Sequence, residues 1–230
     1  MKKIFHISIS FWLISNVIQA QQFKMSQGIS ITEYQFTNDL GQKVNGIRSA
    51  PGISTQASFH KEHLVDINNL NVEQSKIGIL LGQNPKLLKF LTFLNYDLGI
   101  QYLQMNSVGD IQKNAFSYQT DYLGVQGKFG LRVKLPLNFS LNLQGLVSGH
   151  KMLYGSQFVN GYYVDLAEDH QFSAIKVLGG FGGEFERKFS ERLVGFFAYQ
   201  QSQTLNGIAQ GQSTLNFKPV VFSLGFRMFN

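Results

Sequence analysis

The sequence predicts an all-β fold, an up-and-down antiparallel transmembrane β-barrel of eight strands, with ten strands as the alternative. Three observations carry this prediction. Long segments alternate polar and apolar residues with a period of two, as in strands with two different faces. Long and short connections alternate between these segments. Charged residues make up 15% of the chain, against about 25% in an average soluble domain, whereas there are 21 phenylalanines and 23 glycines.

Residues 1–20 have the features of a secretory signal peptide, with a cationic start, an apolar stretch and a small residue, Ala20, before the expected cleavage point. The apolar stretch is too short for a helical membrane anchor. Residues 21–230 then form the barrel domain, which we expect in the cell outer membrane. Its formal charge of +4, from 18 basic and 14 acidic residues, gives no case for a nucleic-acid partner. The absence of cysteine excludes a thiol nucleophile and a disulfide scaffold.

Eight segments show the alternation, weakly at first and most clearly in the middle of the chain. In order they are 27–36, 50–60, 95–102, 118–134, 137–152, 171–188, 192–204 and 220–228. The three longest run for about 16–18 residues, whereas strands of globular proteins usually have about 5–6. A tilted strand needs about 9–11 residues to cross a bilayer. The lengths therefore favour a membrane barrel over a soluble β-sandwich.

The connections divide into two classes, as expected for a barrel with loops on one side of the membrane and tight turns on the other. Long connections are predicted at 37–49, 106–117, 153–170 and 205–216, and short ones around Pro136 and Ser190. Residues 61–91 do not fit this scheme. They hold either an extra hairpin turning near Asn84-Pro85, which gives ten strands, or a periplasmic insertion.

The polar parity of the strands carries charges of both signs, which predicts a polar network in the lumen. The network residues are Asp97, Lys128, Arg132, Lys134, Lys176, Glu184, Glu186 and Arg227. The interior of an eight-stranded barrel is just wide enough for side chains to fill. Because an unpaired buried ion is costly, these charges are expected to pair across strands. We therefore expect a plugged, salt-bridged core without a continuous pore.

Other candidate sites are weak. Gly179–Gly183 lacks the spacing of a nucleotide-binding loop and lies within a strand-like segment. Ser148 and His150 share a face, but their order is the reverse of that in outer-membrane lipid A deacylases, so a hydrogen-bonded pair in the lumen is expected instead. His60 and His63 have no carboxylates arranged around them in the sequence. No metal site and no cofactor is predicted.

The connection 153–170 is the predicted recognition surface. It combines exposed aromatic and acidic residues, a composition that suits protein contacts. Its candidate residues are Tyr162, Tyr163, Asp165, Glu168 and Asp169, with Phe158 beside them.

The C-terminal strand resembles the assembly signal that barrel-assembly machinery reads. Ser223, Gly225, Met228 and Phe229 fit that pattern, whereas Asn230 departs from the usual final aromatic residue. Three further motifs are shared with a known family: Gln19-Ala20-Gln21 before Gly28-Ile29-Ser30, the sequence Pro51-Gly52-Ile53, and residues 221–227. Together they resemble the small PorT-like outer-membrane β-barrel proteins of Bacteroidetes, over most of residues 21–230 apart from 61–91.

The leading hypothesis is a non-enzymatic outer-membrane barrel that is structural or binds a partner through its extracellular loops. The resemblance to PorT-like proteins implies an accessory role in secretion machinery. One alternative is a small porin or transporter, which conductance would reveal. A second alternative is a lipid-modifying enzyme, whose effect on lipid A would be lost in His150→Ala. The expected partners are outer-membrane lipid, the assembly machinery and a protein bound at the loops.

Overall fold

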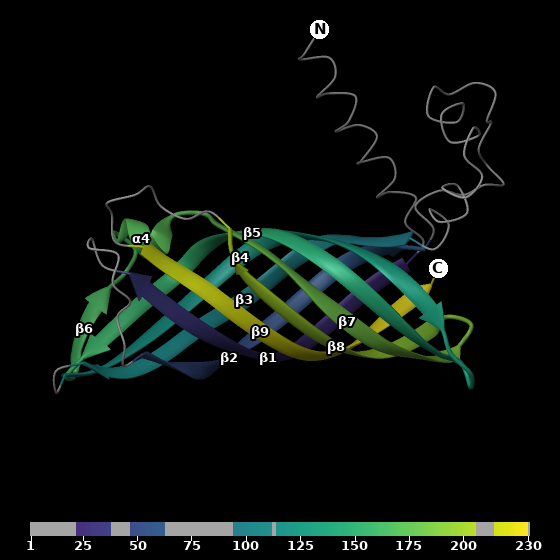
Figure 1. Cartoon of the computed structure of the whole chain (residues 1–230), viewed down its shortest axis with the longest axis horizontal. Coiled ribbons are helices and arrows are strands. Elements are labelled where there is room, and N and C mark those ends of the chain that lie inside the picture. Colours follow the sequence, from purple (N-terminus) through teal and green to yellow (C-terminus); the bar gives the residue numbers. More distant parts are fainter. Residues whose placement is uncertain (1–21, 38–46, 63–93, 112–113, 206–213, 230) are drawn as a thin grey trace, which may run out of the picture.

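A computed structural model describes residues 22–37, 47–62, 94–111, 114–205 and 214–229. Eight long antiparallel strands form the wall of an elongated barrel (Figure 1). They are β1 (Gln22–Thr37), β2 (Ile47–Lys61), β3 (Leu94–Ile111), β4 (Asn114–Lys134), β5 (Phe139–Val159), β7 (Lys176–Ser190), β8 (Leu193–Thr204) and β9 (Thr214–Phe229). A short strand, β6 (Tyr162–Asp165), pairs with the C-terminal end of β5, and a helical turn, α4 (His170–Ser173), follows it.

The long strands pair with their neighbours in sequence order, with β5 pairing directly with β7. The ring closes where β1 pairs with β9, in a register that runs from Gln22 opposite Phe229 to Thr37 opposite Thr214. Every long strand therefore has two hydrogen-bonded neighbours, and no long edge is left open. The predicted eight-stranded barrel is confirmed. The extra hairpin of the ten-stranded alternative would fall in 61–91, of which all but Lys61 and Glu62 lies outside the described residues.

Two predicted long connections are instead largely strand. The β3 and β4 strands run to Ile111 and from Asn114, which pair with each other, so only two residues separate the strands. The β5 strand continues to Val159 and turns through Asn160 and Gly161, both at positive φ, into β6. At these ends of β3, β4 and β5, tyrosine, serine and glutamine occur on both faces of the strands. The polar and apolar residues therefore do not alternate there, and the sequence does not reveal the strands.

The start of the predicted segment 171–188 is also wrong. Residues 170–173 form α4, and β7 begins only at Lys176. The short turn around Pro136 does form, with Leu137 and Asn138 at positive φ. No helix in the described part of the chain is long and apolar enough to cross a membrane.

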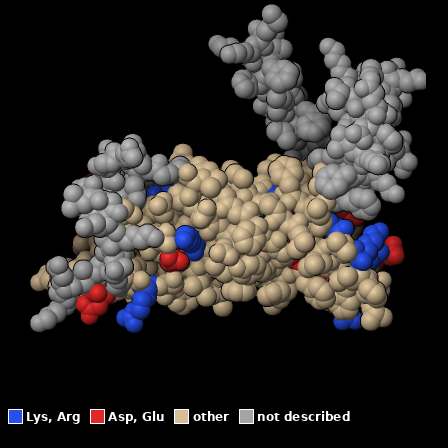
Figure 2. All heavy atoms as spheres, in the orientation of Figure 1, with Lys and Arg blue, Asp and Glu red and all other residues tan. Residues whose placement is uncertain are grey.

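The outer face of the barrel carries a broad apolar belt. On β4 its outward residues run from Leu123 through Val125 and Phe129 to Val133, all of them exposed. Ten residue steps of about 3.3 Å, tilted by about 40°, give a height of about 25 Å. The other strands contribute exposed side chains such as Ile29, Ile53, Ile100, Leu143, Phe181, Phe197 and Leu224. On the face drawn in Figure 2, a broad uncharged stretch lies between charged residues on either side.

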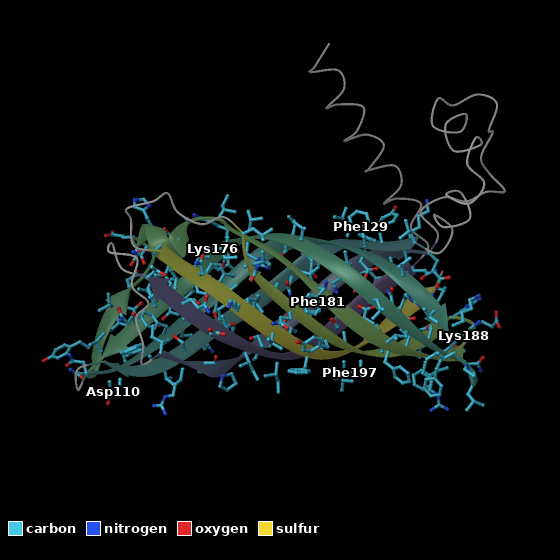
Figure 3. All side chains as sticks on the ribbon, in the orientation of Figure 1. Asp110, Phe129, Lys176, Phe181, Lys188 and Phe197 are labelled. Carbon is cyan, nitrogen blue, oxygen red and sulfur yellow. The ribbon has the colours of Figure 1, made fainter. Side chains whose placement is uncertain are left out.

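The interior has two parts. Buried charged and amide side chains fill the half nearer the short turns, and a cluster of aromatic and aliphatic side chains fills the opposite end. Period-two alternation produces both, because every second residue of each strand must point inward. The inward and outward side chains of this arrangement are drawn in Figure 3.

Candidate functional site: the barrel lumen and its two ends

The first group of buried charges joins three strands around one lysine. Lys24 of β1 lies 2.8 Å from Asp97 Oδ2 on β3 and 2.5 Å from Glu184 Oε2 on β7. The Lys128 ammonium on β4 is 3.7 Å from Glu184 Oε1 and donates to Gln56 Oε1 at 3.0 Å. All four charged side chains are almost fully buried. They form a quartet with two charges of each sign.

A second quartet lies nearer the short-turn end. Arg227 Nη2 on β9 is 3.1 Å from Glu186 Oε2 and 3.6 Å from Glu62 Oε1. Arg132 on β4 pairs with the same two carboxylates. Two guanidinium groups thus share two carboxylates, so the second quartet also has two charges of each sign.

His60 connects the two quartets. Its Nδ1 bonds to Asp97, and its Nε2 lies 2.7 Å from Nη1 of Arg227. A guanidinium can only donate, so Nε2 is the acceptor and Nδ1 carries the proton that His60 donates to Asp97. His60 is therefore neutral in this arrangement, and the eight charged groups around it balance at four of each sign. This balance explains how so many ions are buried in a narrow lumen.

Two of the cations face each other across the seam that closes the ring. Lys24 and Arg227 are direct partners in the register between β1 and β9. Like charges directly opposite each other destabilise a strand pair. Here Asp97 and Glu184 hold Lys24, and Glu186 holds Arg227. The seam therefore depends on carboxylates that come from β3 and β7.

The structure brings together six of the eight residues predicted for the lumen network: Asp97, Lys128, Arg132, Glu184, Glu186 and Arg227. It places Lys134 elsewhere, exposed at the last position of β4, where the strand leaves the lumen. Lys176 is also separate. It lies at the opposite end, donates to the Gln171 carbonyl and stands 5.2 Å above the Phe217 ring, because β7 begins at that end.

The sequence reasoning missed Lys24, His60 and Glu62. Lys24 precedes the expected start of the first strand, although it has the same parity as the inward Gly28 and Ser30. The expectation that His60 has no carboxylate partner is wrong, because Asp97 is its register partner on β3. Extending each strand by parity would have found Lys24, but only the strand register could have found the contact of His60.

An aromatic plug closes the opposite end of the lumen. It consists of Tyr34, Tyr122, Phe172 and Phe217 with Leu166 beside them, and all five side chains are buried. Phe172 comes from α4, whose carbonyl at that residue accepts a hydrogen bond from Tyr122 Oη at 3.0 Å. The segment is also held from the rim, since Lys151 Nζ donates to the Ser173 carbonyl at 2.6 Å. Leu166 of the predicted recognition connection 153–170 and Phe172 just beyond its end therefore pack into the barrel instead of pointing outward.

The β5–β6 hairpin remains exposed. Tyr162 is 78% exposed and Tyr163 54%, and Phe158 packs edge-on against Tyr163 at 5.6 Å. The acidic residues have local roles. Asp165 accepts from the Ala167 amide at 2.8 Å and Asp169 from the Gln171 amide at 2.7 Å, while Glu168 is exposed. The described residues include no group of three or more histidine, aspartate and glutamate side chains that could hold a metal ion.

Ser148 and His150 are both buried in the lumen, as their parity predicts, but the expected hydrogen bond between them is wrong. Neither Ser148 Oγ nor either ring nitrogen of His150 has a hydrogen-bond partner among the described residues. Gly179–Gly183 lies within β7, as expected of a strand-forming segment.

The proposed assembly signal forms the end of β9. Ser223 and Gly225 point inward, and a Cβ at Gly225 would lie 2.7 Å from Ser26 Cβ, so glycine permits the close approach of β1. Met228 is exposed on the outer face, and Phe229 lies at the mouth of the lumen. Recognition of these residues by assembly machinery stays a prediction.

No family model and no curated protein sequence matches the chain. Among solved structures, the chain is similar to a major outer membrane protein of Thermus thermophilus (TM-score 0.48, 12% identity, 90% of this chain and 98% of that one). It is also similar to Neisserial surface protein A (0.44, 13%, 90% and 97%) and to OprG of Pseudomonas aeruginosa (0.40, 12%, 92% and 97%). The outer membrane protease OmpT of Escherichia coli is more distant in score (0.32, 8%, 91% and 96%). These structural neighbours are outer-membrane proteins.

Proposed function

We propose that the chain is a non-enzymatic outer-membrane β-barrel whose lumen is closed and whose β5–β6 hairpin binds a partner outside the cell. The apolar belt on a closed ring is the observation that carries this proposal. Exposed leucine, valine and phenylalanine side chains over about 25 Å would be unfavourable in water but match the hydrocarbon layer of a bilayer. The short turns after β4 and β7 then face the periplasm, and the hairpin faces outward.

The two closures of the lumen argue against the porin alternative. Phe172 and its neighbours fill one end, and the two charge quartets fill the other half. An ion crossing the barrel would have to displace paired charges and an aromatic cluster. Purified protein in planar bilayers is expected to give no reproducible conductance steps. Stable steps of a single size would overturn the closed-lumen proposal.

The absence of cysteine from the sequence allows a direct test of location and orientation. Single variants Tyr162→Cys and Leu137→Cys place one thiol on the outer hairpin and one on a short turn. A membrane-impermeant maleimide added to intact cells should label the first and not the second, whereas both should react after lysis. Equal labelling in intact cells, or a barrel that migrates identically before and after boiling, would contradict the proposal.

The aromatic hairpin supports a protein partner because tyrosine and phenylalanine contribute large contact areas at interfaces. The double variant Tyr162→Ser/Tyr163→Ser should fold normally and lose cross-linking of the hairpin to its partner. Leu153→Ser, which alters an exposed residue of β5 below the hairpin, is the matched control. Loss of cross-linking in both variants, or in neither, would count against recognition by the two tyrosines.

An accessory role in secretion machinery is a narrower proposal, supported only by the resemblance of the sequence motifs to PorT-like proteins. Deleting the gene should then reduce the secreted protein fraction without altering lipid A. A lipid-modifying activity would give the opposite result, with altered lipid A that depends on His150. The full burial of His150 supports the non-enzymatic proposal.

A further inference from the structure

A pocket of about 480 Å³ lies at the mouth of the lumen on the short-turn side. Among the described residues its wall is cationic, because Arg132, Lys134, Lys188 and Arg227 line it together with one carboxylate, Glu62. Apolar side chains, among them Leu135 and Leu137, form most of the remaining lining, with Asn138 and Ser140 beside them. Lys188 lies at the end of the barrel where the chain's C-terminus is found (Figure 3).

Two of the cations in this pocket are neutralised by carboxylates, and the two lysines are largely not. Arg132 and Arg227 share Glu62 and Glu186, so these four charges balance. Lys134 has no carboxylate within ion-pair distance among the described residues, and Lys188 has only Glu191 at 3.6 Å, which is 96% exposed. The Nε–H of Arg227, whose side chain is 1% exposed, also has no acceptor in the described part of the chain. The pocket therefore combines excess positive charge with a buried, unpartnered donor.

The rim shows what kind of anion fits. Leu135 and Leu137 sit in the turn between β4 and β5, and Leu137 is 83% exposed. The other short turn has charged residues, Glu191 and Arg192, at the corresponding place. The Lys188 amide donates to the Asn138 carbonyl at 3.0 Å, so the apolar turn and the second lysine are held together. A ligand at this point meets an apolar surface beside positive charge.

Aromatic side chains place this rim at the boundary of the membrane. Phe139 stacks on Phe185 at 5.1 Å, and the Arg187 guanidinium lies 5.3 Å above Phe139 and 5.6 Å above Phe189. Aromatic rings and cations in such a band are typical of the interface between lipid headgroups and hydrocarbon. The exposed leucines of the turn are therefore within reach of acyl chains, while the lysines are within reach of headgroups.

We propose that this pocket binds the phosphate of an anionic phospholipid from the periplasmic leaflet, with Lys134 and Lys188 contacting the phosphate and Leu135 and Leu137 contacting the acyl chains. The inference rests on the proposed membrane location and orientation. It adds a specific lipid site to the general contact between the belt and the bilayer. A soluble anion would use the cations but would gain nothing from the exposed leucines.

Native mass spectrometry of the full mature barrel in a neutral detergent tests the site, with phosphatidylglycerol as the probe. The double variant Lys134→Gln/Lys188→Gln should weaken retention of the lipid about 25-fold, since each basic residue near a lipid surface contributes about fivefold. The control Arg48→Gln/Lys218→Gln removes two charges from the opposite end and should leave retention unchanged. Leu137→Ser should weaken it as well. Equal retention by the lysine variant and wild type would overturn the proposal.

Two further arms distinguish the source of the phosphate. Diacylglycerol, which has the same acyl chains without the phosphate, should not be retained, and inorganic phosphate at equal concentration should not displace phosphatidylglycerol. Retention of diacylglycerol to the same extent, or displacement by inorganic phosphate, would overturn the assignment to a phospholipid. Each variant is first checked for heat-modifiable migration. A wild-type chain without it would refute the membrane barrel itself, whereas a folded wild type without a lysine effect would refute only the site.

Discussion

Replacing Lys24 by methionine tests the charge balance of the lumen directly. The substitution keeps the length of the side chain but removes its contacts with Asp97 and with both oxygens of Glu184, at 2.5–2.8 Å. The eight charges of the two quartets then sum to −1, and six of these side chains are almost fully buried. The remaining ones are partly exposed, Arg132 at 15% and Glu62 at 31%. Among the described residues, Asp97 then keeps its hydrogen bond to His60, and Glu184 keeps Lys128 at 3.7 Å.

The expected loss can be estimated in two ways. Coulomb's law with an effective dielectric constant of about 20 gives about 6 kcal/mol for a single contact at 2.8 Å, before desolvation is subtracted. Removing one partner of a buried pair typically costs about 3–5 kcal/mol. We expect Lys24→Met to lower the free energy of unfolding by about 3–5 kcal/mol, a large part of the total for a domain of this size.

The double variant Lys24→Met/Asp97→Asn is the matched control, because it restores neutrality and leaves an amide oxygen to accept from His60. It should recover at least half of the lost stability. Urea titration of the barrel in detergent micelles, approached from the folded and the unfolded side and read by heat-modifiable migration, measures both. A single variant as stable as wild type, or a double variant that loses the sum of the two single changes, would refute the balance argument.

Two further predictions concern packing, and a third concerns a buried hydrogen bond. Gly28→Ala should destabilise the seam by about 1–3 kcal/mol, because the added Cβ would overlap the Phe222 carbonyl and lie 2.6 Å from Ser223 Cα. The control Gly127→Ala, whose Cβ would face open space, should leave the urea midpoint unchanged. Equal effects of the two variants would contradict the close approach of β1 and β9 at Gly28. Phe172→Ala should release the plug, so that limited trypsin digestion cuts the chain after Lys176. The control Phe158→Ala should leave the bond after Lys176 protected. Protection of this bond in the Phe172 variant would argue against the plug. Tyr34→Phe removes the hydroxyl that donates to the Met105 carbonyl at 2.6 Å and should lower the free energy of unfolding by about 1 kcal/mol. The same urea titration measures this loss, and an unchanged midpoint would contradict a stabilising hydrogen bond at this position.

The parity of side chains made the fold predictable, but it did not determine which residues meet. Asp97, Lys128 and Glu184 were assigned to the lumen because they share a face with polar neighbours, and they lie there. The contact of His60 with Asp97 depends on the register between β2 and β3, which includes an irregularity between Ala50 and Ser54. Pro51 and Gly52, residue types that often mark bulges, lie at this irregularity, but the sequence does not show how far the register shifts.

The outer end was less predictable for a different physical reason. Beyond the belt, both faces of a strand meet water or protein, so tyrosine and serine occur on either side and the period of two disappears. Phe172 plugs the lumen through a helical turn of four residues, which is too short to show a helical period. Its role follows from tertiary packing against Tyr34 and Phe217, which only the closed ring brings together.

The like-charged seam between Lys24 and Arg227 has a consequence for the order of folding. The two residues are more than two hundred positions apart, and their strands are the first and the last of the ring. If β1 and β9 met early, the Lys24 ammonium and the Arg227 guanidinium would approach each other without the carboxylates that neutralise them. Once β3 and β7 are in place, their carboxylates neutralise both cations and the same encounter becomes favourable. The electrostatics of the seam therefore penalise premature closure, and they favour a sequence of events in which the terminal strands join last.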